Sequence, residues 1–232
     1  MMVALHNAPL NIHHLFKEYG LIIKVKKGSH IFREGERAEN IFFVEQGAIQ
    51  ISKETEQGKE LTLRICGPHA IMGESAMFCK ASYHSTSAKA VESSQLLTLQ
   101  TDTLELLLSE NPPLMLEYIK WLQTESLKHQ SRLRDLMLNG KKGALFSTLI
   151  RLANTYGEFR SNNEVFIDFA LTNTDIANLC ATSREMINRM LNDLKNNDIL
   201  SFEKGYITIN NLQFLKDEIS CENCPLSICR ID

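Results

Sequence analysis

Several features that would place this chain of 232 residues in a common class are missing. No apolar run approaches the roughly 18 residues of a membrane-spanning helix, and the N-terminus MMVALHNAPLNIHH lacks the basic start and apolar stretch of a secretory signal. No glycine-rich phosphate loop, nucleophile elbow or acid pair in a clear cleft motif is present, so we expect no enzyme. The net charge of −3 excludes a chain that binds polyanions over its whole surface. We therefore expect a cytoplasmic protein without membrane partners, in which thiols stay reduced.

Residues 20–100 have the pattern of a β domain. Glycine-containing turn signals recur at short spacing, and ELTLRIC alternates so that Leu61, Leu63 and Ile65 share one face. Many short strands between such turns predict a barrel or sandwich-like domain. Residues 112–138 are instead helical in pattern, with prolines only at the start and no glycine. The sequence LNGKK that follows predicts a helix stop and a hinge.

The helix at 112–138 carries apolar or small positions at alternating spacings of three and four. These positions are Met115, Ile119, Leu122, Ser126, His129, Leu133 and Leu136. The spacing is typical of a helix that pairs with a second copy of itself. A helix packed on its own domain is the alternative, and the polar Ser126 and His129 weaken the seam.

The most specific motif is LTNTDIANLCATSREMINRMLNDLKNNDILSFEKGYITI. Thr172 or Asn173 can cap a first short helix, and Thr182 or Ser183 can cap a second. Each helix has one apolar face, and the residues expected to point inward are Ile176, Ala177, Leu179, Met186, Ile187, Met190, Leu191 and Leu194. Two short strands around a turn at Lys204-Gly205 then predict a wing. Together these features predict a DNA-reading helix-turn-helix.

Polar residues gather at the start of the second helix of this motif. Arginine can bind guanine through two hydrogen bonds, glutamate can accept one from cytosine, and Asn188 can read adenine or contact phosphate. A solvated helix face with a Glu185–Arg189 pair is the alternative. The pattern favours double-stranded DNA as a partner, and the candidate contacts are Thr172, Thr182, Ser183, Arg184, Glu185, Asn188 and Arg189.

Three of the six cysteines lie in the last twelve residues, CENCPLSICRID. Cys221, Cys224 and Cys229 have the spacing C-x2-C-x4-C, which is typical of thiolates around an iron–sulfur cluster, although such clusters usually take four ligands. Zinc and a redox disulfide remain alternatives. Cys66, Cys79 and Cys180 are scattered along the chain and are predicted to be small core residues.

The stretches KKGSHIFREGERAENIFFVEQGAIQIS, MGESAMF and LTNTDIANLCATSREMINRML together resemble the Crp/Fnr superfamily of bacterial transcription regulators. The positions that carry the first match are Gly28, Glu34, Gly35, Ala38, Phe42 or Phe43, and Gly47. The resemblance implies an α+β chain with four parts. These are a β-roll sensor domain with an N-terminal helix (1–111), a dimerisation helix (112–140), a winged helix-turn-helix (141–220) and a cysteine tail (221–232).

The same resemblance implies how such a protein would act. It implies a homodimer that works with RNA polymerase and reads a palindrome such as TGTGA–N6–TCACA. Arg184, Glu185 and Arg189 match the family's base-reading positions. Asn188 departs from the small residue common there, which leaves one base preference open.

Members of the superfamily that bind cyclic AMP have an arginine eleven residues after the pocket glycine. The residue at that distance from Gly73 is His84, and no arginine occurs in SAMFCKASYHSTSAKAV. Lys80 and Lys89 cannot give the bidentate phosphate contact of arginine. Glu74 matches the position that holds a ribose hydroxyl, but members without nucleotide also have it as a turn or capping residue. We therefore expect no cyclic nucleotide.

Fnr regulators sense oxygen with a [4Fe-4S] cluster. No cysteine precedes Cys66, unlike in the enteric type, whereas the terminal C-x2-C-x4-C matches the Bacillus type. That resemblance implies the metal ligands Cys221, Cys224, Cys229 and Asp135. On the residues alone, Asp135 would be an exposed helical residue paired with Arg132.

A cluster with these ligands would clamp the tail onto the dimerisation helix. Our hypothesis is that the clamp holds two recognition helices about one DNA turn apart, ~34 Å, and that loss of the cluster to oxygen opens it. Two alternatives remain. One is a cluster-free regulator, such as an arginine-catabolism type, and the other is a small-molecule-binding module without a DNA role.

Overall fold

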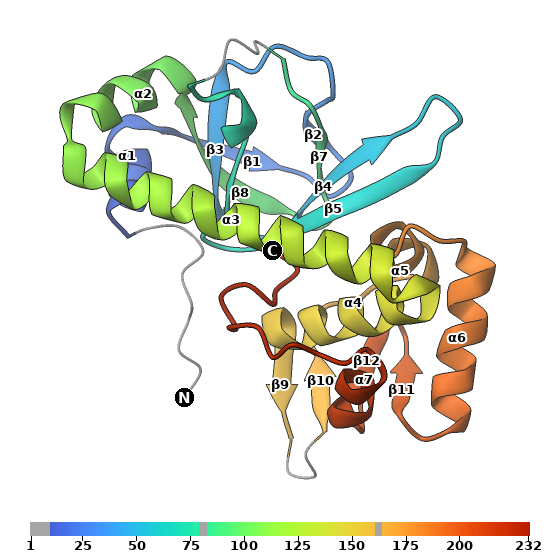
Figure 1. The fold of residues 1–232 in the computed structure, drawn as a ribbon. Helices are drawn as coiled ribbons and strands as arrows, with labels where there is room; N and C mark the ends of the chain where they lie inside the picture. Colours follow the sequence, from blue (N-terminus) through green and yellow to red (C-terminus); the bar gives the residue numbers. More distant parts are fainter. Residues whose placement is uncertain (1–9, 79–82, 161–163) are drawn as a thin grey trace. The chain divides into compact units, whose positions relative to one another are not determined.

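A computed structural model describes residues 10–78, 83–160 and 164–232. The chain forms two compact units, one of residues 1–123 with Asp232 and one of residues 124–231. The division falls within the long helix α3 (Pro112–Leu138), which contributes residues to both units (Figure 1). Across the described residues, no helix combines the length and hydropathy needed to cross a membrane.

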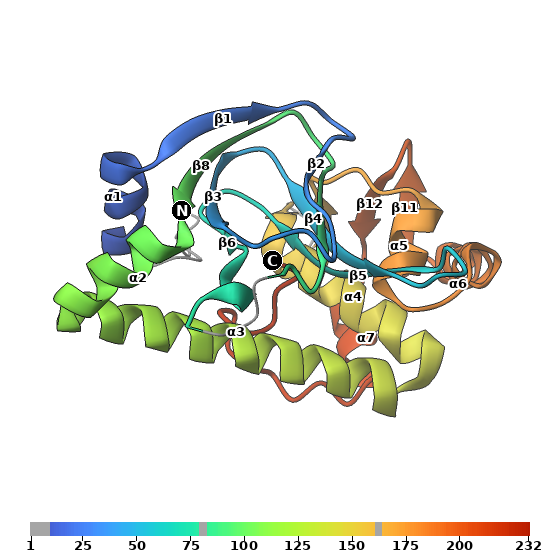
Figure 2. The same ribbon diagram turned by 90° about the horizontal axis from the view of Figure 1, so that it is seen from above.

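Two four-stranded antiparallel sheets build the first unit (Figure 2). The sheet β1-β8-β3-β6 comprises β1 (Leu21–Val25), β8 (Ser94–Gln100), β3 (Asn40–Gln46) and β6 (Ile71–Met72). The sheet β2-β7-β4-β5 comprises β2 (His30–Phe32), β7 (Ser87–Ala90), β4 (Ile49–Glu54) and β5 (Glu60–Cys66). Helices α1 (Leu10–Tyr19) and α2 (Thr101–Glu110) lie at one end of the roll, and a short 3-10 helix η1 (Glu74–Ala76) follows β6. The predicted β-roll is confirmed.

One turn of the roll requires a glycine, at position 47. Gly47 has a φ of +89°, and a Cβ there would lie within 2.8 Å of the Ser94 backbone. Any other residue would be strained at this turn and would also collide with β8.

Strand β5 buries the face that its leucines do not occupy. Thr62, Arg64 and Cys66 are buried, whereas on the predicted face Leu61 and Leu63 are only half-buried and Ile65 alone is buried. The amide of Gln50 on β4 donates to the Thr62 hydroxyl at 2.9 Å. Part of the roll interior is therefore polar, and simple alternation did not indicate this.

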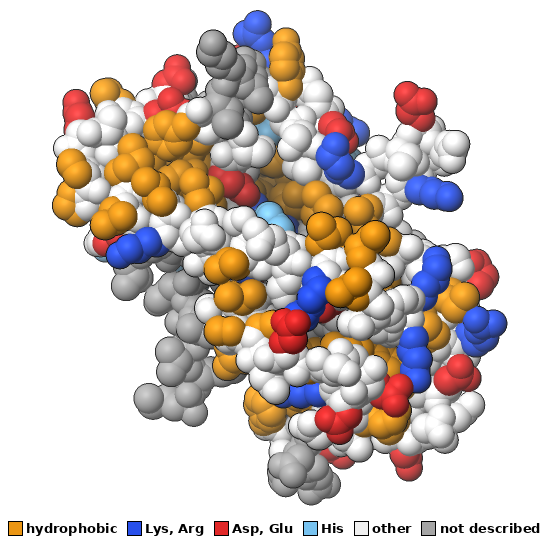
Figure 3. Space-filling model, viewed as in Figure 1, with side chains coloured by type: hydrophobic (Ala, Val, Ile, Leu, Met, Phe, Trp, Pro, Cys, Tyr) orange, Lys and Arg blue, Asp and Glu red, His pale blue; other side chains and the backbone are white. Residues whose placement is uncertain are grey.

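In the first unit, α3 packs on the roll mainly through residues beside the predicted seam. Leu114, Tyr118 and Trp121 join a buried cluster with residues of α1, α2 and the first sheet, and two seam residues, Met115 and Leu122, also pack against this cluster. The seam lies beside this face: Ile119 is 52% and Leu133 61% exposed. Met115, Leu122 and Leu136 are half-buried, while Ser126 and His129 are exposed. Hydrophobic side chains also gather on the surface over α2 and the start of α3 (Figure 3).

The second unit is a winged helix-turn-helix, as predicted. Its helices are α4 (Gly140–Tyr156), α5 (Asn173–Leu179), α6 (Arg184–Asn196) and α7 (Leu212–Glu218). Its sheet, β11-β12-β10-β9, comprises β11 (Leu200–Glu203), β12 (Tyr206–Ile209), β10 (Val165–Ile167) and β9 (Gly157–Phe159). Lys204 and Gly205 both have positive φ and form the tight turn of the wing.

Candidate functional site

Local hydrogen bonds define the two helices of the helix-turn-helix. Thr172 caps α5 with a capping box, in which its hydroxyl accepts from the Asp175 backbone N–H and its own N–H donates to the Asp175 carboxylate. The hydroxyl of Ser183 caps α6 by accepting from the Met186 N–H at 3.2 Å. Between them, Ala181 takes a left-handed φ of 50°. The caps are therefore Thr172 and Ser183, and not the neighbouring Asn173 and Thr182.

The predicted DNA-reading side chains of α6 are accessible. Arg184, Glu185, Asn188 and Arg189 are all exposed. The pKa of Glu185 is lowered, because its carboxylate accepts from its own N–H and from Ser183. Within the described part of the chain, Glu185 and Arg189 form no ion pair with each other. The exposed face is thus available to a ligand.

Asn188 and Thr182, two of the predicted DNA contacts, differ from the exposed arginines of this motif. Asn188 accepts a hydrogen bond from the Asn173 amide at 3.1 Å, which joins α6 to the first residue of α5. The buried hydroxyl of Thr182 has no partner among the residues that the structure describes. Because this oxygen is inaccessible in the structure, the DNA contact predicted for Thr182 stays a prediction.

The inward faces of the helices agree with the sequence pattern except at two methionines. The buried residues are Ile176, Ala177, Leu179, Ile187, Leu191 and Leu194. Met186 and Met190 are instead half-buried and line a cavity of about 640 Å³ with Phe146 and Phe214. These two methionines were predicted to point inward, and they are less buried than the other inward residues.

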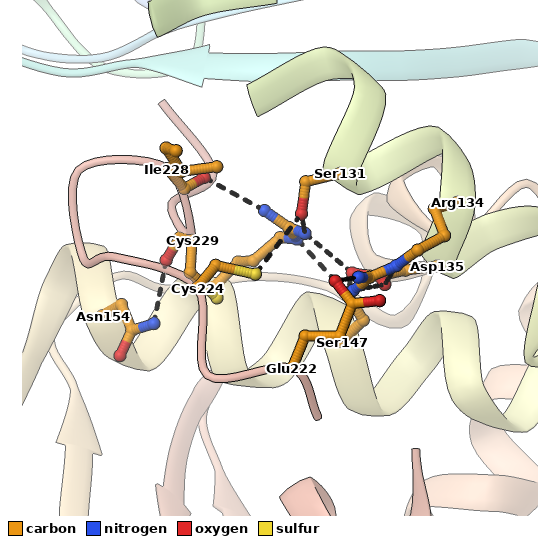
Figure 4. Close-up of polar contacts among 10 residues, drawn as sticks. Ser131, Arg134, Asp135, Ser147, Asn154, Glu222, Cys224, Ile228 and Cys229 are labelled. Carbon is orange, nitrogen blue, oxygen red and sulfur yellow. Dashed lines mark hydrogen bonds and ion pairs between the residues drawn. The ribbon is translucent and has the colours of Figure 1, made fainter. Parts of the chain in front are cut away.

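The cysteine tail is docked onto its own unit. After α7 it runs back along α4, where the amide of Asn154 donates to the Cys229 carbonyl at 2.8 Å (Figure 4). The Ile231 N–H donates to the Thr155 hydroxyl at 3.1 Å. Cys229 is only 8% exposed, and Cys221 and Cys224 are half-buried. All three are free thiols.

The tail thiols lie close to α3. The Cys224 thiol is 3.8 Å from the Ser131 hydroxyl, one helical turn before Asp135. Burial raises the pKa of Cys229, and the charge of Arg151 offsets this only in part. The proximity of Cys224 and Cys221 also acts to raise this pKa. The three tail thiols therefore lie near one another.

Asp135 is buried, with only 3% exposure. Arg134 donates to its Oδ1 through Nε at 3.0 Å and Nη2 at 2.6 Å. Ser147 and Arg151 donate to its Oδ2 at 2.5 Å and 2.7 Å. Burial acts to raise the pKa of Asp135, but the hydrogen bonds from Ser147, Arg151 and Arg134 outweigh it and hold the pKa below its usual value. The carboxylate is thus ionised and accepts four hydrogen bonds.

The simpler prediction for Asp135, an exposed residue paired with Arg132, is wrong. Arg132 instead donates to the Leu179 carbonyl at the end of α5, at 3.0 Å. Because burial is the main influence on Arg132, its pKa falls to about 10. Arg132 therefore connects α3 to the first helix of the DNA-reading motif.

Sequence reasoning missed Arg151, which is 1% exposed and lies at the centre of the site. Besides Asp135, it donates to Ser131 at 2.9 Å, to Ser147 at 3.2 Å and to the Ile228 carbonyl at 3.3 Å. One signal could have found it: it is a lone charge in the apolar stretch ALFSTLIRLA. A charged residue in such a helix needs buried partners.

The side chains at the tail are of the chemical types that bind an iron–sulfur cluster. Free thiols and an ionised carboxylate are suitable donors to iron, and nearby arginines offset the negative charge of these ligands. Among the described residues, no three His, Cys, Asp or Glu side chains already surround one metal-ion position. Each ligand of a four-iron cluster binds a different iron, so its ligands need not meet at one point.

The interior of the roll shows where the predicted nucleotide-related positions lie. Glu74 begins η1 and accepts from Arg64 at 2.7 Å, and both side chains are largely buried. His84 stacks on Phe32 with ring centroids 3.8 Å apart. Burial lowers the pKa of His84, although Glu36 acts to raise it, so the imidazole is kept neutral. Lys89 is exposed, and Lys80 lies outside the described residues.

The remaining cysteines fit the prediction of core residues where they are described. Cys66 is buried at the end of β5. Cys180 is buried at the end of α5, where burial raises its pKa to about 11. Cys79 lies outside the described residues.

Comparison with known proteins agrees with this architecture. The cyclic nucleotide-binding domain family matches residues 22–111, and the Crp-like helix-turn-helix domain family matches residues 144–218. The "Anaerobic regulatory protein" of Bacillus subtilis (strain 168) is 46% identical over 210 residues, which cover 90% of this chain and 88% of the relative. The chain belongs to the Crp/Fnr family of transcription regulators.

Two further comparisons agree with the family and the fold. The "Fumarate and nitrate reduction regulatory protein" of Yersinia pestis is 26% identical over 82% of this chain and 75% of its own length. The structure of FixK2 from Bradyrhizobium japonicum has a TM-score of 0.74 at 17% identity and covers 85% of this chain and 96% of that chain. Crp-like regulators of this kind bind DNA and act as dimers, and they are not enzymes. This chain is accordingly a DNA-binding transcription regulator.

Proposed function

We propose that this Crp/Fnr regulator responds to oxygen through a [4Fe-4S] cluster held by Cys221, Cys224, Cys229 and Asp135. The observation that carries the proposal is the docking of the cysteine tail beside Asp135, with Cys224 3.8 Å from Ser131 on the same helix. When bound, the cluster would supply the reactivity towards oxygen. The name of the Bacillus subtilis relative, "Anaerobic regulatory protein", supports this assignment.

The residues around the site connect it to the DNA-reading helices. Asp135 and Arg132 lie on the same helix, and Arg132 donates to the last residue of α5 at 3.0 Å. A change in the position of α3 at Asp135 therefore acts on the end of α5. Because α5 is hydrogen-bonded to α6 through Asn173 and Asn188, such a change also affects the reading helix.

The exposed seam of α3 supports a homodimer. Ile119 and Leu133 expose most of their side chains, and buried apolar area is the main driving force for helix pairing. A second copy seated along this face would present two α6 helices to a two-fold symmetric site such as TGTGA–N6–TCACA. RNA polymerase is the further partner that this role requires.

The roll is proposed to take no cyclic nucleotide. Glu74, which would hold a ribose hydroxyl, is already paired with Arg64 at 2.7 Å. His84 occupies the position of the phosphate-binding arginine and is buried against Phe32. A neutral stacked imidazole cannot neutralise a cyclic phosphate.

The test is DNA binding before and after exposure to air. Anaerobically purified protein should bind the palindrome more tightly than random DNA at matched salt, and air should weaken that binding by at least tenfold. Cys224→Ser should abolish the difference between the two conditions, while Cys66→Ser, the same change outside the tail, should keep it. Equal binding in both conditions by the wild type would instead support the cluster-free alternative.

A further inference from the structure

Both arginines at the site bridge Asp135 to the tail. Arg151 donates to Asp135 at 2.7 Å and to the Ile228 carbonyl at 3.3 Å. Arg134 donates to Asp135 and forms an ion pair with Glu222, which lies between the first two tail cysteines. The segment that carries the three thiols is therefore joined to Asp135 through two guanidinium groups (Figure 4).

The two bridges differ in strength. Glu222 and part of Arg134 are exposed to solvent, so their ion pair contributes little. Arg151 is almost fully buried and uses both of its terminal nitrogens and Nε. The Arg151 bridge is therefore the dominant one.

Asp135 has no acceptor site to spare. A carboxylate offers about four lone-pair positions, and Arg134, Ser147 and Arg151 together fill four. Before Asp135 can bind iron, it must give up at least one of these donors. Arg151 can release it without being left unpartnered, because it retains Ser131, Ser147 and the Ile228 carbonyl.

We propose that Arg151 is the positioning residue of this site: it holds the tail in place through Ile228 and orients Asp135 beside the segment that carries the thiols. The proposal rests on the proposed function. It differs from the clamp hypothesis, because it predicts that the tail stays docked in protein from which the cluster has been removed.

The test is hydrogen exchange on the full-length, cluster-free chain. The Ile231 amide donates to the Thr155 hydroxyl of α4, so a docked tail protects it. We expect tail peptides of the wild type to be protected, and Arg151→Gln to speed their exchange at least tenfold. Peptides from β11 and β12 serve as internal references, because a general loss of stability would speed their exchange as well.

Lys142→Gln is the matched control. It removes a cation from the same helix, but one that pairs with Glu218 in α7 and not with the tail. The tail amides of the Lys142→Gln variant should exchange their hydrogens at the wild-type rate. If Arg151→Gln does not fold, Arg151→Lys takes its place, because lysine keeps a charge for Asp135 but cannot span Ser131 and Ile228 as the guanidinium does.

The outcomes separate the two proposals. Selective loss of tail protection in the Arg151 variant, together with slower cluster uptake during anaerobic reconstitution, supports the positioning role. Tail exchange within twofold of the wild type in Arg151→Gln or Arg151→Lys would overturn it, as would an unprotected tail in the wild type. A protected tail in a chain that takes up no iron would overturn only the proposed function.

Discussion

Substitution of Asp135 by alanine should destabilise the cluster-free protein strongly. The change leaves the guanidinium of Arg151, 1% exposed, without its counter-charge. Removing one partner of a buried ion pair typically costs about 3–5 kcal/mol. The low end applies here, because Arg151 keeps neutral acceptors on Ser131 and Ile228. The Ser147 hydroxyl also loses its acceptor, at about 1 kcal/mol, so we expect a total of about 4 kcal/mol.

The assay is urea unfolding of the whole chain, monitored by far-UV circular dichroism under reducing, metal-free conditions, and the transition that shifts in Asp135→Ala is assigned to the second unit. The single tryptophan, Trp121, belongs to the first unit, so its fluorescence would not report this change. Asp135→Ala/Arg151→Met removes both charges, and it should recover at least about 2 kcal/mol of the loss. The reasoning is refuted if Asp135→Ala costs under about 1 kcal/mol, or if the double variant is no more stable than the single one.

Three further predictions follow from the described contacts. Arg184→Ala should weaken binding to the palindrome by about 1–3 kcal/mol while changing random-DNA binding little, as measured by fluorescence anisotropy at matched salt; a loss of equal size on both DNAs would contradict base reading. Because the pKa of His84 is lowered in the fold, the unfolded chain takes up its proton first, so stability should fall as pH drops below 6.5. His84→Phe should flatten that pH dependence in thermal melts, and an unchanged slope would argue against a buried neutral imidazole. With a pKa of about 11, only about one part in a thousand of Cys180 is thiolate at pH 8. Iodoacetamide should therefore label the half-exposed Cys221 before Cys180. Equally fast labelling of Cys180 in the native chain would contradict its burial.

The local features of the DNA-reading motif could be predicted from the sequence because they depend on neighbouring residues. The caps at Thr172 and Ser183 satisfy N–H groups three positions away. The turn at Lys204-Gly205 is fixed by backbone preference. Burial of Ile187 and Leu191 follows from helical spacing.

The polar centres could not be predicted in this way, because their partners are distant in the sequence. Arg151 contacts Ser131 on α3 and Ile228 in the tail, and no local pattern brings those two together. Arg64, on the face of β5 that the leucines do not occupy, donates to Glu74 at the start of η1. Charge and periodicity alone indicate neither pairing.

The helix seam shows a different limit. The heptad spacing placed Ile119 and Leu133 on one face, but spacing cannot distinguish a face that packs on the same chain from one that pairs with another. In the structure, Tyr118 and Trp121 make the internal contact, and Met115 and Leu122 of the seam pack against it. Ile119 and Leu133 stay exposed, and their pairing with a second copy of the chain stays a prediction.

The most direct test of the central claim is an iron and acid-labile sulfide assay, with an absorption spectrum, on anaerobically purified protein. We predict four irons and four sulfides per chain, with visible absorbance that is lost in air. Protein without iron, or with stoichiometric zinc instead, would contradict the assignment of Cys221, Cys224, Cys229 and Asp135 as ligands of an oxygen-responsive cluster.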